Sequence, residues 1–268
     1  MKKILVLLLT ALLLTACSGK EEEADTTITV AATAEPHATI LEYVAPLLEE
    51  KGYTLEIEVL DNYFIFNRSL DNGDVDANYF QHRPFFENEV TEYGYDIVEA
   101  AGIHIEPFGI YSSKYETIDD IENGSRVIIS NSIADHGRIL KILEDAGLIT
   151  IAEDVDVIDA TVADIVDNPK NLVFEEVNPE LVTTAYTNGD GDLFAINGNY
   201  ALGAGLDPVN DSLLLESVDS SNPYVNILAV KNGDEDSPKI KALVDVLKSD
   251  EVKAWITEHF GGSVIIVD

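Results

Sequence analysis

The residues that could carry chemistry in this chain are one cysteine, five histidines and 50 acidic side chains. Three motifs that would organise such residues for catalysis or nucleotide binding are absent: Gly-x-Ser-x-Gly, His-Glu-x-x-His and the Walker-type Gly-x4-Gly-Lys. Gly198, Gly203 and Gly205 have the wrong spacing for a dinucleotide fingerprint. These absences count against an enzyme.

A zinc site is one alternative for the histidines. His37, His82 and His104 would be candidate ligands if the fold brought them together, because imidazole is a common zinc ligand. Histidines so far apart in sequence more often cap helices or form hydrogen bonds. We therefore expect no metal and no cofactor.

The N-terminus has the pattern of a secretory signal. Lys2 and Lys3 form a short basic region, and the run from Ile4 to Leu14 is almost entirely apolar. That run is too short for a spanning helix and fits a cleaved signal. It ends in Leu14-Thr15-Ala16-Cys17, which resembles the lipobox of bacterial lipoproteins.

The lipobox resemblance implies cleavage before Cys17 and acylation of its thiol. Cys17 is the only cysteine, so it cannot form an internal disulfide. We expect residues 1–16 to be the signal peptide and 17–26 a lipidated flexible tether. The protein would then lie on the extracytoplasmic face of the cell membrane. A plain secretory peptide is the alternative.

Composition indicates a globular body, since 46% of the residues are apolar. The formal net charge is −34. A surface so acidic argues against nucleic acid, or an anionic membrane face, as a partner.

Alternating strand-like and helix-like patterns predict an α/β fold. Thr27–Ala32 reads as a strand, and the apolar spacing up to Lys51 reads as an amphipathic helix. A second strand follows at Leu55, Ile57 and Val59, and strand–helix–strand order favours a parallel sheet. Further strands are expected at Arg126–Ile129, Leu172–Val177, Leu193–Ile196 and Val225–Val230, and helices at Asp135–Ala146, Pro238–Leu247 and Val252–Phe260.

Five segments, in consistent order from about Ile28 to the C-terminus, resemble the methionine-binding lipoprotein (NlpA/MetQ-like) family, the solute-binding components of methionine ABC importers. They are Asp61–Tyr63, Asp76–His82, Ala160–Leu172, Ala195–Ala201 and Asn222–Asn226. The resemblance implies a two-lobe periplasmic-binding-protein fold, with two crossover strands and a ligand cleft between the lobes.

The same resemblance places the crossovers near Pro107–Tyr111 and Pro223–Val230. Lobe 1 would comprise residues 27–108 plus 227–268, and lobe 2 residues 109–226. It further implies capture of L-methionine or a close derivative by lobe closure, as a monomer, and delivery to the membrane subunits of an ABC importer. The alternatives are an enzyme on the same scaffold and a surface adhesin or scaffold lipoprotein with a vestigial cleft.

The ligand-binding residues carried over from the family are Tyr63, Phe80, His82, Arg138, Asn197 and Asn226. By resemblance, Arg138 binds the ligand's carboxylate, for which a guanidinium near a helix start is well suited. Asn197 and Asn226 bond its polar α-substituents. Tyr63, Phe80 and His82 surround the thioether, and aromatic faces attract sulfur.

Several neighbouring residues are assigned other roles. We expect Tyr79 to be a core residue, since it alternates with Phe80 in a short strand. Tyr224 is expected to pack. Asn199 is an alternative to Asn197 as a ligand-binding residue, but we expect it to cap the helix that follows it. One loop departs from the family pattern: Asn131-Ser-Ile-Ala-Asp-His-Gly-Arg138 differs at its central positions, which leaves a methionyl peptide open as the ligand.

Overall fold

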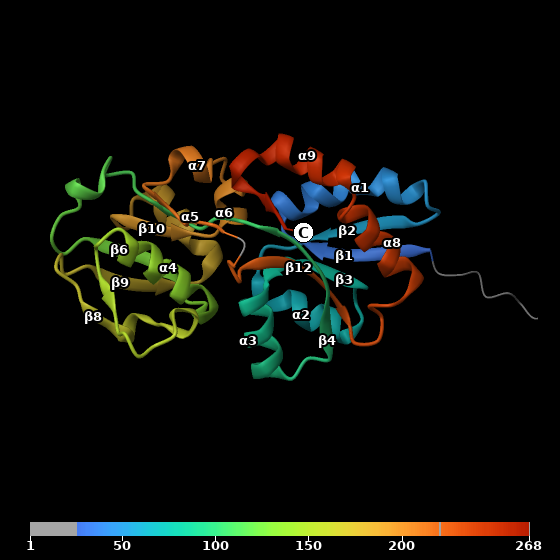
Figure 1. Ribbon diagram of the computed structural model, residues 1–268, viewed down its shortest axis with the longest axis horizontal. Helices are drawn as coiled ribbons and strands as arrows, with labels where there is room; N and C mark the ends of the chain where they lie inside the picture. Colours follow the sequence, from blue (N-terminus) through green and yellow to red (C-terminus); the bar gives the residue numbers. More distant parts are fainter. Residues whose placement is uncertain (1–25, 220, 268) are drawn as a thin grey trace, which may run out of the picture.

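The structure is a computed structural model that describes residues 26–219 and 221–267. The predicted signal peptide, Cys17 and nearly all of the predicted tether lie outside the described residues. The described chain forms two lobes, each around its own sheet, and Figure 1 shows them side by side. The chain passes from the first sheet to the second after β4 (Ile97–Ile105), and returns after β11 (Leu214–Leu215).

Lobe 1 contains a six-stranded sheet of order β13-β4-β12-β3-β1-β2. Besides β4, its strands are β1 (Thr27–Ala32), β2 (Thr54–Val59), β3 (Ala77–His82), β12 (Val225–Lys231) and β13 (Ile265–Ile266). Its helical segments are η1 (Ala34–Ala38), α1 (Thr39–Glu49), α2 (Tyr63–Asn72), α3 (Arg83–Tyr93), α8 (Pro238–Leu247), α9 (Asp250–Phe260) and η5 (Gly261–Ser263).

The expectation of a parallel sheet is correct for only part of lobe 1. β1 pairs in parallel with β2 and β3, but β12 is antiparallel to both β3 and β4. The physical reason is connectivity, since β12 enters the sheet from the other lobe and runs against its neighbours. The amphipathic helix predicted up to Lys51 is α1, which ends two residues earlier, at Glu49.

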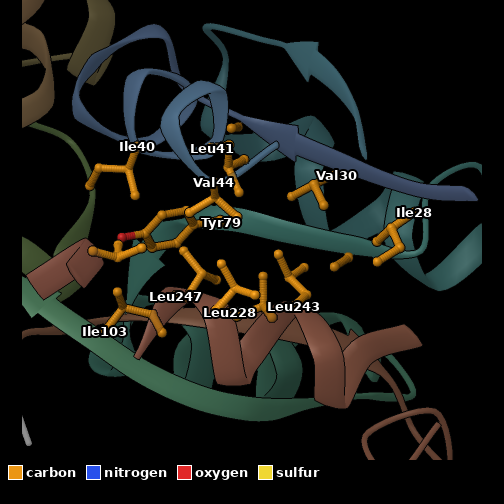
Figure 2. Close-up of a cluster of buried hydrophobic side chains, with 14 of the residues drawn as sticks. Ile28, Val30, Ile40, Leu41, Val44, Tyr79, Ile103, Leu228, Leu243 and Leu247 are labelled. Atoms are coloured by element: carbon orange, nitrogen blue, oxygen red, sulfur yellow. The ribbon is translucent and has the colours of Figure 1, made fainter. Parts of the chain in front are cut away.

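The main core of lobe 1 lies between the sheet and α1, α8 and α9. Figure 2 shows Tyr79 among Ile28, Val30, Leu41, Val44 and Leu243. The Tyr79 side chain is fully buried, which confirms the expected core role. Burying each such apolar side chain contributes about 1.5–3 kcal/mol.

Lobe 2 contains a five-stranded sheet of order β11-β5-β10-β6-β9. Its other strands are β5 (Gly109–Tyr111), β6 (Arg126–Ser130), β9 (Val173–Val177) and β10 (Leu193–Ile196), and the ribbon β7 (Thr150–Ile151) with β8 (Ile165–Asp167) lies apart from the sheet. The helices are α4 (Ile133–Asp145), α5 (Pro179–Asn188), α6 (Gly198–Gly203) and α7 (Pro208–Asp211), with single turns η2 (Ile118–Asp120), η3 (Val157–Asp159) and η4 (Val162–Asp164).

Among the described residues, every helix is too short or too polar to traverse a bilayer.

Candidate functional site

A small cavity between the lobes brings together all six residues that the sequence pointed to. Its lining is Tyr63, Phe80, Gln81, His82, Phe85, Glu106, Arg138, Asn197, Gly198, Asn199 and Asn226. The volume open to the centre of a water-sized sphere is about 20 Å³. This is room for about one water molecule, so the two walls are nearly in contact.

The β12 register fixes three polar residues side by side in lobe 1. Asn226 pairs with His82 of β3 on one side and with His104 of β4 on the other. Side chains at paired positions point to the same face of a sheet. The pairing therefore places Asn226 and His82 together in the cavity lining, with His104 beside them.

Aromatic rings form the apolar part of the lobe 1 wall. Tyr63 is the first residue of α2, and the side chain of Asn62 caps that helix by accepting from Phe64 N–H. The Tyr63 ring lies 5.7 Å from both Phe80 and Phe85, measured between centroids. The Phe80 ring also stacks on the ring of Phe66, with 4.0 Å between the two centroids.

A chain of hydrogen bonds joins the two walls through Asp135, in the first turn of α4. The Nδ1 atom of His82 accepts from Phe85 N–H, so its Nε2 carries the proton and donates to Asp135 Oδ1 at 2.9 Å. Asp135 Oδ2 accepts from Asn197 Nδ2 at 3.2 Å. A carboxylate only accepts, so the Asn197 amide is oriented with Oδ1 turned the other way. That oxygen is buried, and within residues 26–219 and 221–267 it has no hydrogen-bond partner.

The Asp135 carboxyl is therefore held ionised. Burial acts to raise its pKa, but the hydrogen bond from His82 and the charge of Arg138 lower the pKa below the usual value.

Arg138 is 4% exposed and borders the cavity from α4. It forms an ion pair with Glu216, and its Nη2 donates to the Glu106 carbonyl at 2.9 Å. The Tyr224 ring packs against the guanidinium, with 4.3 Å from Cζ to the ring centroid. The hydrogen bonds of Arg138 to Glu216 and to the Glu106 carbonyl are donated by Nε and Nη2. The side chain is thus rigidly placed.

The prediction that Arg138 lies at a helix start is only roughly correct. α4 begins at Ile133, so Arg138 is in its second turn. The helix dipole acts mainly within the first turn, and therefore the charge on Arg138, rather than the helix terminus, is the main positive feature here.

Glu106, which the sequence did not single out, is a buried carboxyl in the cavity wall. Its Oε1 lies 2.8 Å from His104 Nε2 and 3.3 Å from His37 Nε2. The outer ring nitrogens bond to hydroxyls: His104 Nδ1 to Tyr79 at 2.5 Å, and His37 Nδ1 to Thr33 at 2.7 Å. Burial raises the pKa of Glu106, and the interactions with His37 and with the guanidinium of Arg138 oppose that rise.

The zinc alternative takes a different form in the structure. His37 and His104 do converge, but with Glu106, and His82 bonds Asp135 instead. The His37 and His104 side chains are completely buried, which lowers their pKa values to about 4 and about 3. His37 Nε2 also lies 3.2 Å from Asn226 Oδ1, so the cluster is joined to a residue of the cavity lining.

Contacts across the cleft hold the walls together beside the cavity. The Tyr63 hydroxyl donates to Asn199 Oδ1 at 2.5 Å, and the Tyr200 hydroxyl to the Asp61 carbonyl at 2.6 Å. The expectation that Asn199 caps a helix is wrong. Asn197 occupies the cap position of α6, and Asn199 lies inside the helix with its side chain turned to lobe 1.

Gly198 is required by the close approach of the two walls. A Cβ on it would lie 2.7 Å from Glu106 Cβ and 2.8 Å from Glu106 Oε2. Neither wall can accommodate such a contact without movement, so a residue with a side chain at this position is excluded from the observed arrangement.

The comparisons with known proteins agree with this architecture. The family model described as NlpA lipoprotein matches residues 28–267. The chain belongs to the NlpA lipoprotein family. Methionine-binding lipoprotein MetQ of Bacillus subtilis (strain 168) is 49% identical over 251 residues, which cover 93% of this chain and 89% of that protein. D-methionine-binding lipoprotein MetQ of Escherichia coli (strain K12) is 30% identical over 259 residues, covering 96% and 94%.

A solved relative supports the two-lobe fold. The nutrient-binding protein of Burkholderia cenocepacia, whose structure is bound to methionine, superposes with a TM-score of 0.84 at 34% identity. The match covers 90% of this chain and all of that one. The two-lobe fold expected from the sequence is confirmed.

A second, larger hollow of about 600 Å³ borders α4 and the segment 214–224. It includes Arg138 and Tyr224, but none of the other five predicted binding residues. In this member of the NlpA family all six residues predicted to bind the ligand line the smaller cavity instead.

Proposed function

We propose that this chain is an exported lipoprotein that captures methionine, or a close derivative, in the cavity between its lobes and delivers it to an ABC importer. The observation that carries the proposal is the convergence of Arg138, Asn197, Asn226 and the aromatic wall around one cavity. Relatives that cover nearly the whole chain bind methionine by name, and one is solved with methionine bound.

Each part of a free amino acid has a partner in this cavity. Arg138 Nη1, which the hydrogen bonds to Glu216 and Glu106 do not use, is assigned to the ligand's carboxylate. The unpaired Asn197 Oδ1 and the Asn226 amide are assigned to the α-substituents. Tyr63, Phe80 and His82 are assigned to the thioether chain, where aromatic–sulfur contacts contribute about 0.3–1.5 kcal/mol each.

Binding requires the walls to separate and close again, because hydrogen bonds from Tyr63 to Asn199 and from Tyr200 to Asp61 join them beside the cavity. We propose that the two predicted lobes, residues 27–108 plus 227–268 and residues 109–226, move as separate bodies, except that Val225 and Asn226 move with lobe 1 because they pair with β3 and β4. The ligand favours the closed arrangement through contacts on both walls, and that preference limits the shift in population. The closed form, tethered through lipid on Cys17, is the form that would dock on the importer.

The test is calorimetric titration of the full-length protein in detergent, first stripped of carried-over ligand by unfolding and refolding. L-methionine, D-methionine and methionyl dipeptides are titrated separately. One-to-one binding of at least one of them is expected. If none binds, the proposal is wrong, and native mass spectrometry of unstripped protein would then identify the true cargo.

A further inference from the structure

The two segments that connect the lobes meet at one side chain, that of Glu216. The first connection runs from β4 to β5 and contains Phe108, and the second runs from β11 to β12 and contains Asn222. Glu216 directly follows β11, and its N–H donates to the Phe108 carbonyl at 2.9 Å. Its carboxylate accepts from Phe108 N–H at 3.0 Å and from Asn222 Nδ2 at 3.2 Å. One carboxylate therefore joins both connections.

Arg138 is held at the same place by both connections. Its guanidinium forms the ion pair with Glu216, and Nη2 also donates to the Glu106 carbonyl on the first connection at 2.9 Å. Its Cζ atom lies 5.1 Å from the centroid of the Phe108 ring and 4.3 Å from that of the Tyr224 ring. The guanidinium thus contacts an aromatic ring from each connection, an arrangement that favours a cation.

Glu216 is connected to the cavity between the lobes through Arg138. Arg138 borders both that cavity and the larger hollow beside α4, and Glu216 borders the larger hollow. Any effect of Glu216 on a ligand in the cavity would therefore pass through the guanidinium.

The contacts of Glu216 lie where a hinge must bend. In hinge closure, a few residues of the connecting segments absorb the change in backbone angles, while the lobes move as bodies. Arg138 Nη2 donates both to Glu216 and to the Glu106 carbonyl, which directly follows β4 of lobe 1. A ligand that fixes the guanidinium would thus also fix the first connection in the arrangement seen here.

We propose that Glu216 is a positioning residue of the hinge, which couples occupation of the cavity at Arg138 to closure of the two lobes. The inference rests on the proposed function and names the residue that converts binding into movement. Glu216 itself makes no contact with the ligand in this account, so its removal should impair closure more than it impairs the first contact with Arg138.

The experiment measures affinity and closure separately in full-length wild type, Glu216→Gln and Glu175→Gln. The glutamine keeps the length of the side chain and removes its charge. Glu175 is the matched control, because it pairs with Arg126 on the exposed surface of the same lobe. Calorimetric titration gives the affinity for L-methionine. Hydrogen exchange, followed by mass spectrometry at saturating methionine, reports closure at residues 62–66 of lobe 1 and 197–201 of lobe 2.

These two segments contain the starts of α2 and α6, where the first N–H groups of a helix have no partner within the helix. Methionine should slow their exchange by at least about 10-fold in wild type and in Glu175→Gln. In Glu216→Gln the affinity should fall about 10-fold, because less of the bound protein is closed. Saturating methionine should then slow exchange of residues 62–66 by less than about threefold.

Two results would overturn the inference while the proposed function stands. One is a saturated Glu216→Gln protein that protects residues 62–66 as strongly as wild type, even if its affinity is lower, because Glu216 would then only support Arg138. The other is wild type that binds methionine without protection of either segment.

A second variant covers a Glu216→Gln protein that does not fold. Asn222→Ala keeps the ion pair of Glu216 and removes its bond to the second connection. Protection of residues 62–66 should be weaker in it than in wild type, and full protection would contradict the inference. Wild type that binds neither methionine nor any methionyl peptide would instead overturn the proposed function, and this inference with it.

Discussion

The lobe 1 wall of the cavity is carried by strands and packed rings, whereas the lobe 2 wall is carried by residues near the N-terminal ends of α4 and α6. In lobe 1, β12 pairs with both β3 and β4, and one register places His82, Asn226 and His104 together. In lobe 2, Arg138 and Asn197 are held by ionised partners, Glu216 and Asp135. Packing and register thus position one wall, and charge pairs position the other.

This difference predicts how substitutions in each wall should affect the position of the side chains. A residue set by sheet register is supported by many backbone bonds, so a single side-chain change there is expected to alter chemistry more than placement. A residue held by a buried ion pair loses its placement and leaves an uncompensated charge when the partner is removed.

The largest effect is expected at the Arg138–Glu216 pair. Arg138→Ala leaves the half-buried Glu216 without its positive partner, although Phe108 N–H and Asn222 still donate to it, and should lower the free energy of unfolding by about 3 kcal/mol. The double variant Arg138→Met with Glu216→Leu removes both charges and should recover most of that loss. Urea unfolding of wild type, Arg138→Met, Glu216→Leu and the double variant measures this. If the losses simply add, charge pairing does not position the lobe 2 wall.

A pH effect is expected at His104 in lobe 1. Burial lowers the folded-state pKa of His104 from 6.5 to about 3. Below pH 6.5 the unfolded chain binds a proton at His104 that the folded chain does not. The free energy of unfolding therefore decreases by about 1.4 kcal/mol for each unit by which the pH is lowered below 6.5.

Other groups titrate in the same range, so the quantity to measure is the stability of wild type minus that of His104→Gln. This difference should decline steadily from pH 6.5 to pH 4. The glutamine keeps an amide that can bond Glu106. A difference that stays constant over this range would show that His104 is not buried in its neutral form.

Gly198→Ala addresses the contact between the walls. The added Cβ would overlap Glu106 only when the lobes are closed. Overpacking costs about 1–3 kcal/mol, so methionine affinity should fall about 5- to 150-fold, while the free energy of unfolding changes little.

Gly203→Ala is the control for this substitution. Gly203 lies in the same helix, and its added Cβ would meet nothing within 4 Å. Equal affinities of the two variants would mean that the walls do not close on one another as the structure shows.

The smallest effect is expected from Tyr63→Phe. The change removes the hydrogen bond from the Tyr63 hydroxyl to Asn199 Oδ1 across the cleft and keeps the ring packed on Phe80 and Phe85. A loss of about 1 kcal/mol, or roughly fivefold in affinity, is expected. Calorimetric titration measures it, and a loss of a hundredfold would show that the hydroxyl contacts the ligand itself.

Local pattern was sufficient to predict several elements. β1, β10 and α8 have the predicted bounds, because their apolar spacing and their Pro or Gly flanks are local signals. The mixed direction of the lobe 1 sheet was not predictable in this way. It depends on β12 returning from lobe 2, and no local pattern encodes that.

The candidate site was predicted in part, through family resemblance rather than chemistry. All six residues line one cavity. Glu106 was missed because it is one of 50 acidic residues, and its partners His37 and His104 come from separate elements. Asn199 was misassigned because the Asn-Gly-Asn segment offers two residues for one cap, and only the fold shows that Asn197 takes it.

The most direct test of the central claim is titration of L-methionine into full-length wild type, Arg138→Ala and Arg126→Ala. Arg126 is a matched control, since it pairs with Glu175 on the exposed surface of the same lobe. Circular dichroism establishes that each variant is folded at the titration temperature. We predict one-to-one binding by wild type and Arg126→Ala, and an affinity at least about 100-fold lower for Arg138→Ala. A folded Arg138→Ala protein that binds methionine as tightly as wild type would contradict the account.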